Sequence, residues 1–166
     1  MAKRFRGEST HKVDGKGRVS IPASFRRVLE EGDPDWTDGL QPQVVIVYGR
    51  HSNTKNCLLG FSMVGIARLE EQIDELPHGE ERERIERQLL TRSTHAAVDD
   101  TGRIVLSQKL RETAGITDEA VFAGVGGRFE IWQPAAYEAH EGLEGGEPFD
   151  AMRALADARR KAGLGP

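Results

Sequence analysis

Two short motifs combine a carboxylate and a guanidinium at the same spacing. Both have the form Asp-x-x-Gly-Arg, and they run from Asp14 to Arg18 and from Asp99 to Arg103. Across a tight turn, an aspartate and an arginine four residues apart can pair, and the pair orients the guanidinium. Each motif can therefore hold a turn together, present an arginine to an anion, or do both.

The two motifs belong to a longer internal repeat. Residues 11–26 recur in altered form at residues 96–111, and both copies continue as an apolar-x-apolar stretch that ends in Phe-Arg or Leu-Arg. Such a repeat indicates two similar modules in one chain, and 166 residues suffice for two small ones. We predict domains at residues 5–80 and 81–141, followed by a flexible tail at residues 142–166.

The charge of the chain is unevenly distributed. The net charge is −4, but residues 1–28 carry eight lysines and arginines against two carboxylates, a net charge of +6, which leaves −10 for the rest. This asymmetry favours a local surface for a polyanion on an acidic body; a basic face that is merely solvated is the alternative. Lys16 adds a cation to the first motif, whereas Asp100 and Thr101 leave the second nearly neutral. We therefore expect the two copies to contribute unequally.

Composition excludes several classes of protein. With 37% apolar and 30% charged residues the chain is typical of a soluble globular protein, and no apolar run approaches the ~20 residues of a membrane span. The basic N-terminus lacks the apolar segment of a secretion signal. Cys57 is the only cysteine, so an intrachain disulfide is impossible and a reducing cytoplasm fits.

No motif indicates an enzyme. Residues 14–18 lack the spacing and the following helix of a phosphate loop, and residues 124–127 lack the third glycine of a dinucleotide site. The five histidines and Cys57 have no metal-ligand spacing, and Asp99 and Asp100 are typical of a turn. We therefore predict no catalytic residue, no metal, no cofactor and no small-molecule substrate.

Periodicity predicts the secondary structure. Alternating apolar residues on both sides of each motif predict two β-hairpins, at residues 13–21 and 97–106. Helices are expected from Pro22 to Gly32 and from Ser107 to Gly115. The remaining expected strands are 44–48, 57–61, 120–122 and 129–132, and the remaining expected helices are 66–76, 80–90, 135–143 and a short one within 149–161. The apolar strands 44–47 and 120–122 should need a second layer, so we do not expect a monomer.

Four segments together resemble the MraZ family of bacterial transcriptional regulators. They are Phe5-Arg-Gly7, the first motif from Val13 to Ala23, the second from Val98 to Leu106, and Phe129-Glu-Ile-Trp132. The resemblance covers about residues 5–141 in order and spacing. It implies an α+β fold of two tandem SpoVT/AbrB-like swapped-hairpin β-barrel modules with flanking helices, assembled into rings. It also implies that the two Asp/Arg motifs line a surface that binds direct repeats of double-stranded DNA in the promoter of the family's own operon.

The resulting hypothesis is a cytoplasmic, nucleoid-associated transcriptional regulator of the division and cell-wall gene cluster. The expected DNA-binding residues are Arg4, Arg6, Lys12, Asp14, Lys16, Arg18, Asp99 and Arg103. The alternative is an antitoxin-like protein-interaction module with secondary DNA binding, which acts through an extended acidic segment from Glu144 onward. RNA binding is less favoured, because Phe5 and Phe25 are the only aromatic rings near the basic residues.

Overall fold

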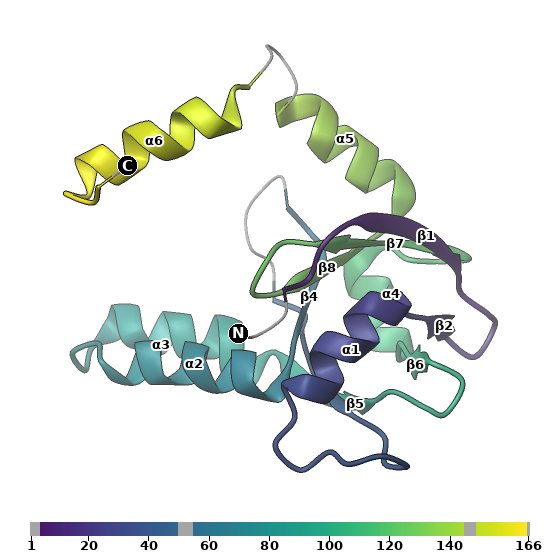
Figure 1. Cartoon of the computed structure of the whole chain (residues 1–166). Helices are drawn as coiled ribbons and strands as arrows, with labels where there is room; N and C mark the ends of the chain where they lie inside the picture. Colours follow the sequence, from purple (N-terminus) through teal and green to yellow (C-terminus); the bar gives the residue numbers. More distant parts are fainter. Residues whose placement is uncertain (1–3, 50–54, 145–148, 166) are drawn as a thin grey trace.

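The computed structural model describes residues 4–49, 55–144 and 149–165 (Figure 1). The fold is α+β, and its named strands pair antiparallel. The strands are β1 (Glu8–Lys12), β2 (Arg18–Ser20), β3 (Gln43–Val47), β4 (Leu58–Phe61), β5 (Ser93–Ala97), β6 (Arg103–Val105), β7 (Glu119–Gly124) and β8 (Phe129–Trp132). The helices are α1 (Ala23–Glu31), α2 (Met63–Asp74), α3 (Glu80–Glu86), α4 (Gln108–Ala114), α5 (Pro134–Glu144) and α6 (Ala151–Lys161), and a π-helical segment, η1 (Arg87–Thr91), continues α3.

The two copies of the repeat share their sheets. Six strands form one sheet in the order β1-β7-β8-β4-β3-β5, and β2 pairs with β6 in a separate two-stranded ribbon. Strand β1 corresponds to β5 in the repeat, and the order of the halves read from one end of the sheet equals the order read from the other end with the two halves exchanged. Strands of residues 5–80 and 81–141 are hydrogen-bonded neighbours at three places in this sheet, β1–β7, β8–β4 and β3–β5.

The predicted hairpins around the two motifs are only partly correct. The turn forms, since Asp14 N–H donates to the Arg18 carbonyl at 3.0 Å, but within the first copy only an isolated bridge joins Val13 to Val19. The prediction of self-paired strands is wrong, because each turn is bonded to the other copy. Gly17 O accepts from Leu106 N–H at 2.7 Å, and Gly102 O accepts from Ile21 N–H at 2.9 Å. These two bonds draw β2 and β6 together.

The core combines side chains from both copies. The Phe5 ring packs edge-on against the rings of Phe25 and Phe129 at centroid distances of 5.3 and 5.0 Å, and all three are buried. The expectation that strands 44–47 and 120–122 leave apolar surface for a second subunit is wrong, because these strands are buried within the single chain. Each half supplies the second layer that the other half needs.

The helix signals of the sequence are confirmed at α1 and α4. Pro22 precedes α1 and Gly32 ends it. The Ser107 hydroxyl accepts from Leu110 N–H at the start of α4, and Gly115 ends that helix at φ +67°. Helix α2 begins earlier than predicted, because the Ser62 hydroxyl caps it by accepting from Gly65 N–H.

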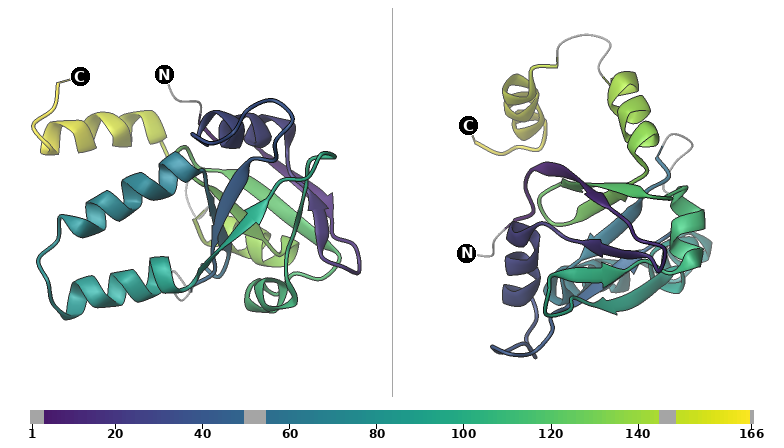
Figure 2. Two further views of the ribbon diagram at one scale, coloured as in Figure 1. Left: turned by 90° about the horizontal axis from the view of Figure 1, so that it is seen from below. Right: turned by 90° about the vertical axis from the view of Figure 1, so that its right-hand side faces the viewer.

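Two peripheral parts extend from the sheets. Residues 63–91, comprising α2, α3 and η1, project from the body as a helical hairpin that we call the arm (Figure 2). Helix α5 packs on the sheet, where the Tyr137 ring lies 5.8 Å from that of Trp132. Helix α6 follows within the tail. In the described ranges, no helix has the length and apolar character needed to cross a membrane.

Candidate nucleic-acid interface

The β2–β6 ribbon carries both motif arginines on one face. Arg18 lies opposite Val105, and Ser20 lies opposite Arg103. These four residues share the outer face of the ribbon, whereas Val19 and Ile104 are 1% exposed on its inner face. The two arginines are therefore diagonal neighbours on an exposed two-stranded surface, with side chains 40% and 37% exposed.

In the first turn, Asp14 binds both the backbone and the arginine. Its Oδ1 accepts from the N–H groups of Lys16 and Arg18 at 2.9 Å, and its Oδ2 accepts from Arg18 Nε at 2.6 Å. The bond from Arg18 N–H is the largest cause that lowers the pKa of Asp14 to about 2, followed by the bond from the Arg18 side chain. Asp14 is therefore ionised at neutral pH and holds the guanidinium by its Nε edge.

The second turn has the same backbone and a weaker arginine contact. Asp99 Oδ1 accepts from the N–H groups of Thr101 and Arg103 at 2.9 Å, and the bond from Arg103 N–H is the main reason why the pKa of Asp99 is lowered. Arg103 Nε, however, donates to the Thr101 hydroxyl at 2.9 Å and lies 3.5 Å from Asp99 Oδ2. Thr101 thus stands between the two charged groups.

Both guanidiniums keep their terminal nitrogens available. Neither Arg18 nor Arg103 makes a hydrogen bond through Nη1 or Nη2 to the described part of the chain. A guanidinium held by Nε alone presents two parallel N–H donors outward, which is the geometry for a bidentate contact with a phosphate or with a guanine edge.

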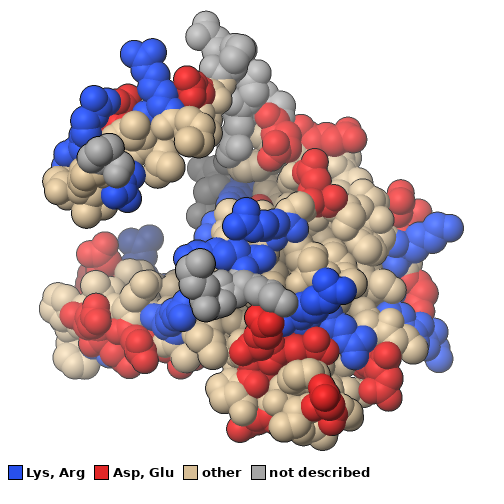
Figure 3. Space-filling model, viewed as in Figure 1, with Lys and Arg blue, Asp and Glu red and all other residues tan. Residues whose placement is uncertain are grey.

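The ribbon borders a hollow of mixed charge. Lys12, Arg18 and Arg103 line this hollow together with Asp14, Asp118 and Glu119. Glu119 lies directly opposite Lys12 in the β1–β7 pairing. Basic and acidic side chains accordingly lie side by side at the right-hand edge of the molecule, where the turn after β1 lies (Figure 3). The +6 segment of the sequence is therefore not a uniformly positive surface.

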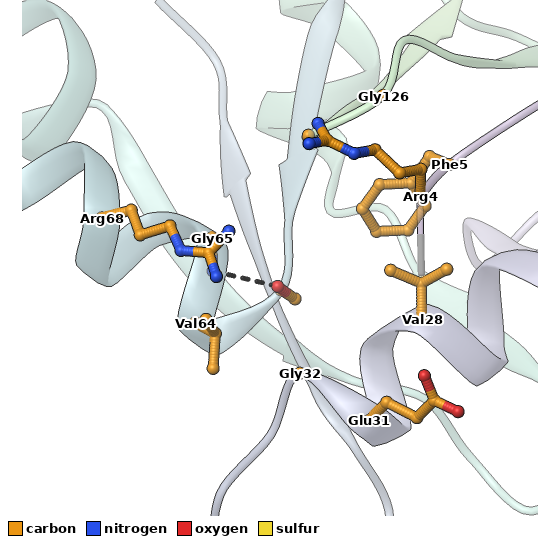
Figure 4. A pocket seen from close by; sticks show the side chains of 11 residues that line it. Arg4, Phe5, Val28, Glu31, Gly32, Val64, Gly65, Arg68 and Gly126 are labelled. Atoms are coloured by element: carbon orange, nitrogen blue, oxygen red, sulfur yellow. Dashed lines mark hydrogen bonds between the residues drawn. The ribbon is translucent and has the colours of Figure 1, made fainter. Parts of the chain in front are cut away.

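Two of the predicted residues lie elsewhere. Arg4 borders a small cavity with Val28 and Gly126, where Arg68 of α2 approaches from another side (Figure 4). The Arg6 backbone lies against Gly124 of β7. Both precede β1, whereas Lys12 ends it, so the length of the strand separates them from the ribbon. The structure brings together Lys12, Asp14, Arg18 and Arg103, with Lys16 and Asp99 in the two turns, and does not bring Arg4 and Arg6 to them.

Two further arginines lie beside the turns. Arg111 Nε donates to the Leu106 carbonyl at 3.0 Å and lies beside Gly17. Arg26 is its counterpart in the first copy, and its guanidinium lies near Gly102. Each arginine thus reaches the turn of the other copy. Their shared position in the repeat is the signal that could have identified them.

The structure places the residues on which the two alternative partners depended. Phe5 and Phe25 are buried in the core at 2% and 1% exposure, so neither ring can stack on an RNA base. The short helix expected within residues 149–161 is confirmed as α6, and because it has four cations and one carboxylate, this part of the tail is not an extended acidic segment. Within the described ranges, no cluster of His, Cys, Asp and Glu side chains could hold a metal ion.

The duplicated turns, the shared sheet and the paired ribbon define a β-ribbon protein built from two copies of one motif, and sequence comparison shows its family. The chain belongs to the MraZ family, whose model, described as "MraZ protein, putative antitoxin-like", matches residues 4–87 and 89–154.

Curated relatives extend the match over most of the chain. The protein named transcriptional regulator MraZ of Ruegeria pomeroyi is 51% identical over 142 residues, which cover 85% of this chain and 84% of the relative. The proteins of the same name from Cereibacter sphaeroides and Roseiflexus castenholzii are 43% and 38% identical, over 87% and 81% of this chain and 88% and 84% of their own lengths.

Proposed function

We propose that this protein is a cytoplasmic, nucleoid-associated transcriptional regulator that binds direct repeats of double-stranded DNA in the promoter of the division and cell-wall gene cluster. The observation that carries the proposal is the outer face of the β2–β6 ribbon, where Arg18 and Arg103 lie as diagonal neighbours with free terminal nitrogens. The names of the curated relatives support the regulatory role.

The ribbon suits the major groove of DNA. That groove admits a two-stranded β-ribbon, and a bidentate arginine contact to guanine is the commonest specific contact there. Val105 is 56% exposed on the same face, and an apolar side chain there can contact a thymine methyl group. Arg18 and Arg103 would read bases, while Lys12 and Lys16 would contact phosphates.

The exchange of strands supports the finer fold assignment. Because β1 pairs with β7 and β3 with β5, we assign residues 5–80 and 81–141 to two SpoVT/AbrB-like modules of the swapped-hairpin kind, and residues 142–166 to a tail. The two modules of one chain together form one ribbon.

A ring of several copies would bind several repeats at once. Each chain contributes one ribbon, and linked ribbons convert later contacts into intramolecular ones, which raises avidity without stronger single contacts. A closed ring repeats the same interface between successive copies.

The test is a fluorescence anisotropy titration with the DNA upstream of the protein's own operon. The wild-type protein should prefer this duplex to a scrambled one of equal composition, and the Arg18→Ala/Arg103→Ala double variant should lose that preference. Arg84→Ala on the arm is the matched control, since Arg84 is an exposed arginine far from the ribbon in sequence and fold. Equal affinity of the wild type for both duplexes, or preserved preference in the double variant, would contradict the proposal.

A further inference from the structure

Helix α6 and the residues just before it carry an apolar stripe that the described part of the chain leaves exposed. Phe149 and Met152 are each 77% exposed, and Leu155 is 55% exposed. Met152 and Leu155, three residues apart, lie along one side of the helix, and Phe149 precedes its first residue by two positions. None of them belongs to either hydrophobic cluster of the described residues. A helix of 11 residues is marginal in water alone, so this stripe needs a partner surface to stabilise it.

The charge of α6 opposes that of the arm. Residues 151–161 contain four cations and one aspartate, a net charge of +3, whereas the arm contains eight carboxylates and four arginines, a net charge of −4. Among the charged side chains in Figure 3, Lys and Arg predominate on α6, whereas Asp and Glu predominate on the arm. Arg153 and Lys161 on α6, and Glu70, Glu71 and Glu75 on the arm, form no ion pair within the described ranges.

The arm also offers apolar surface beside these carboxylates. Leu76 is 38% exposed at the end of α2, and the side chain of Ile85 is only partly covered on α3. A basic amphipathic helix and an acidic helical hairpin with accessible leucine and isoleucine are complementary in both charge and apolar contact.

We infer that α6 of one copy docks on the arm of a second copy of this chain. A second copy is favoured over the same chain because a single chain contains both α6 and the arm, and yet its apolar stripe stays exposed. The inference rests on the proposed ring, and it names a contact that would join successive subunits of that ring from outside the duplicated core.

The first experiment removes the stripe without breaking the helix. Alanine is a good helix former, so Met152→Ala/Leu155→Ala should keep α6 helical while deleting its largest contacts. Sedimentation velocity over a dilution series should show the assembly dissociating at a concentration at least about ten times higher than for the wild type. Ala154→Ser, on the side of the helix away from the stripe, keeps the charge of α6 and is the control, which should leave the dissociation concentration unchanged.

The second experiment identifies the partner. One tagged chain carries Arg160→Cys on α6, a second, differently tagged chain carries Glu75→Cys on the arm, and the native Cys57 is buried. After mixing, a flexible bis-maleimide should join the two chains, and Met152→Ala/Leu155→Ala should suppress that product. A single chain that carries both Arg160→Cys and Glu75→Cys is tested beside them. If this chain cross-links within itself at high dilution, α6 covers its own arm and the inference is wrong.

The remaining outcomes separate this inference from the proposed ring. A monomeric wild type would overturn both. An assembly that resists Met152→Ala/Leu155→Ala as the wild type does would overturn only the role of α6. Should this variant instead lose binding to anionic phosphatidylglycerol vesicles or to random-sequence duplex DNA with its assembly intact, the stripe serves a lipid or nucleic-acid surface and the docking on a second copy is refuted.

Discussion

The two Asp-x-x-Gly-Arg turns have the same backbone but differ in how they hold the arginine. In the first, Asp14 contacts Arg18 Nε directly at 2.6 Å; in the second, Thr101 takes the bond from Arg103 and the carboxylate lies 3.5 Å away. The backbone bonds to the aspartate are all 2.9 Å in both. The aspartate therefore builds the turn in each copy, and the residue two positions later decides how firmly the arginine is oriented.

The turns also differ in how closely the other copy packs on their glycine. A Cβ atom at Gly17 would lie 2.1 Å from the Leu106 carbonyl oxygen, whereas at Gly102 the nearest group would be the Arg26 guanidinium at 3.6 Å. Duplication thus preserved the turn conformation, with φ +83° and +80°, while the surroundings diverged. The first turn has less space and a better-held arginine, and this asymmetry can be tested position by position.

The largest change, a loss in the free energy of unfolding, is expected for a substitution at Gly17. Gly17→Ala combines a left-handed backbone with a clash against backbone atoms, and it should destabilise the protein by at least about 3 kcal/mol. Gly102→Ala adds only the backbone strain and should cost about 1–2 kcal/mol. Urea unfolding followed by circular dichroism measures both. Equal losses would show that the close packing at Gly17 relaxes freely.

Replacement of the more firmly held arginine should cause the larger loss of DNA affinity. Arg18→Ala should reduce affinity for the upstream DNA by about 10- to 100-fold, the usual cost of a bidentate base contact. Arg103→Ala should cost less, because Thr101 weakens its hold and the turn carries no lysine. Anisotropy titrations of the folded variants give the ratio. The asymmetry is refuted if the two single variants lose the same affinity.

Acid stability should depend more on Asp14 than on Asp99. The pKa of Asp14 is lowered to about 2 in the folded protein, below its value of ~4 in an unfolded chain. Its contribution to the free energy of unfolding is therefore complete above about pH 4 and is lost as the pH falls towards 2. Asp14→Asn should flatten the fall in stability over this range, and Asp99→Asn should flatten it less. Urea midpoints at successive pH values measure the slopes, and identical slopes for wild type and Asp14→Asn would rule out this role.

The sequence predicted local structure better than strand partners. Pro22 and Gly32 bound one helix, and Ser107 and Gly115 bound another, because these residues act on the backbone next to them. Alternation at Val19 and Ile21 showed which face of the strand is buried, but it does not specify a partner. The pairing of β2 with β6 depends on bonds such as that from Leu106 N–H to Gly17 O, which join distant segments.

The candidate site was predictable in its residue types and not in its electrostatics. The repeat identified both Asp/Arg pairs, and the structure confirms that each pair lies across its turn. The local charge, however, includes Asp118 and Glu119, which strand pairing brings beside Lys12 from the other half of the chain. Counting charges along residues 1–28 could not include these two carboxylates.

The smallest effect is expected on the salt dependence of DNA affinity, when the residue at the tip of each turn, Lys16 or Thr101, is replaced. Thr101→Lys makes the second turn resemble the first, because it removes the hydroxyl between Asp99 and Arg103 and adds a cation. Each phosphate contact changes the log–log slope of affinity against salt by about −0.9. Thr101→Lys should therefore steepen the slope by about one unit per ribbon bound, and Lys16→Gln should make it shallower by the same amount. Titrations from low to moderate salt with the upstream duplex and its scrambled form provide the slopes. Because phosphate contacts carry no sequence information, the change should be equal for both duplexes, and a change confined to the upstream duplex would place residues 16 and 101 at base edges instead.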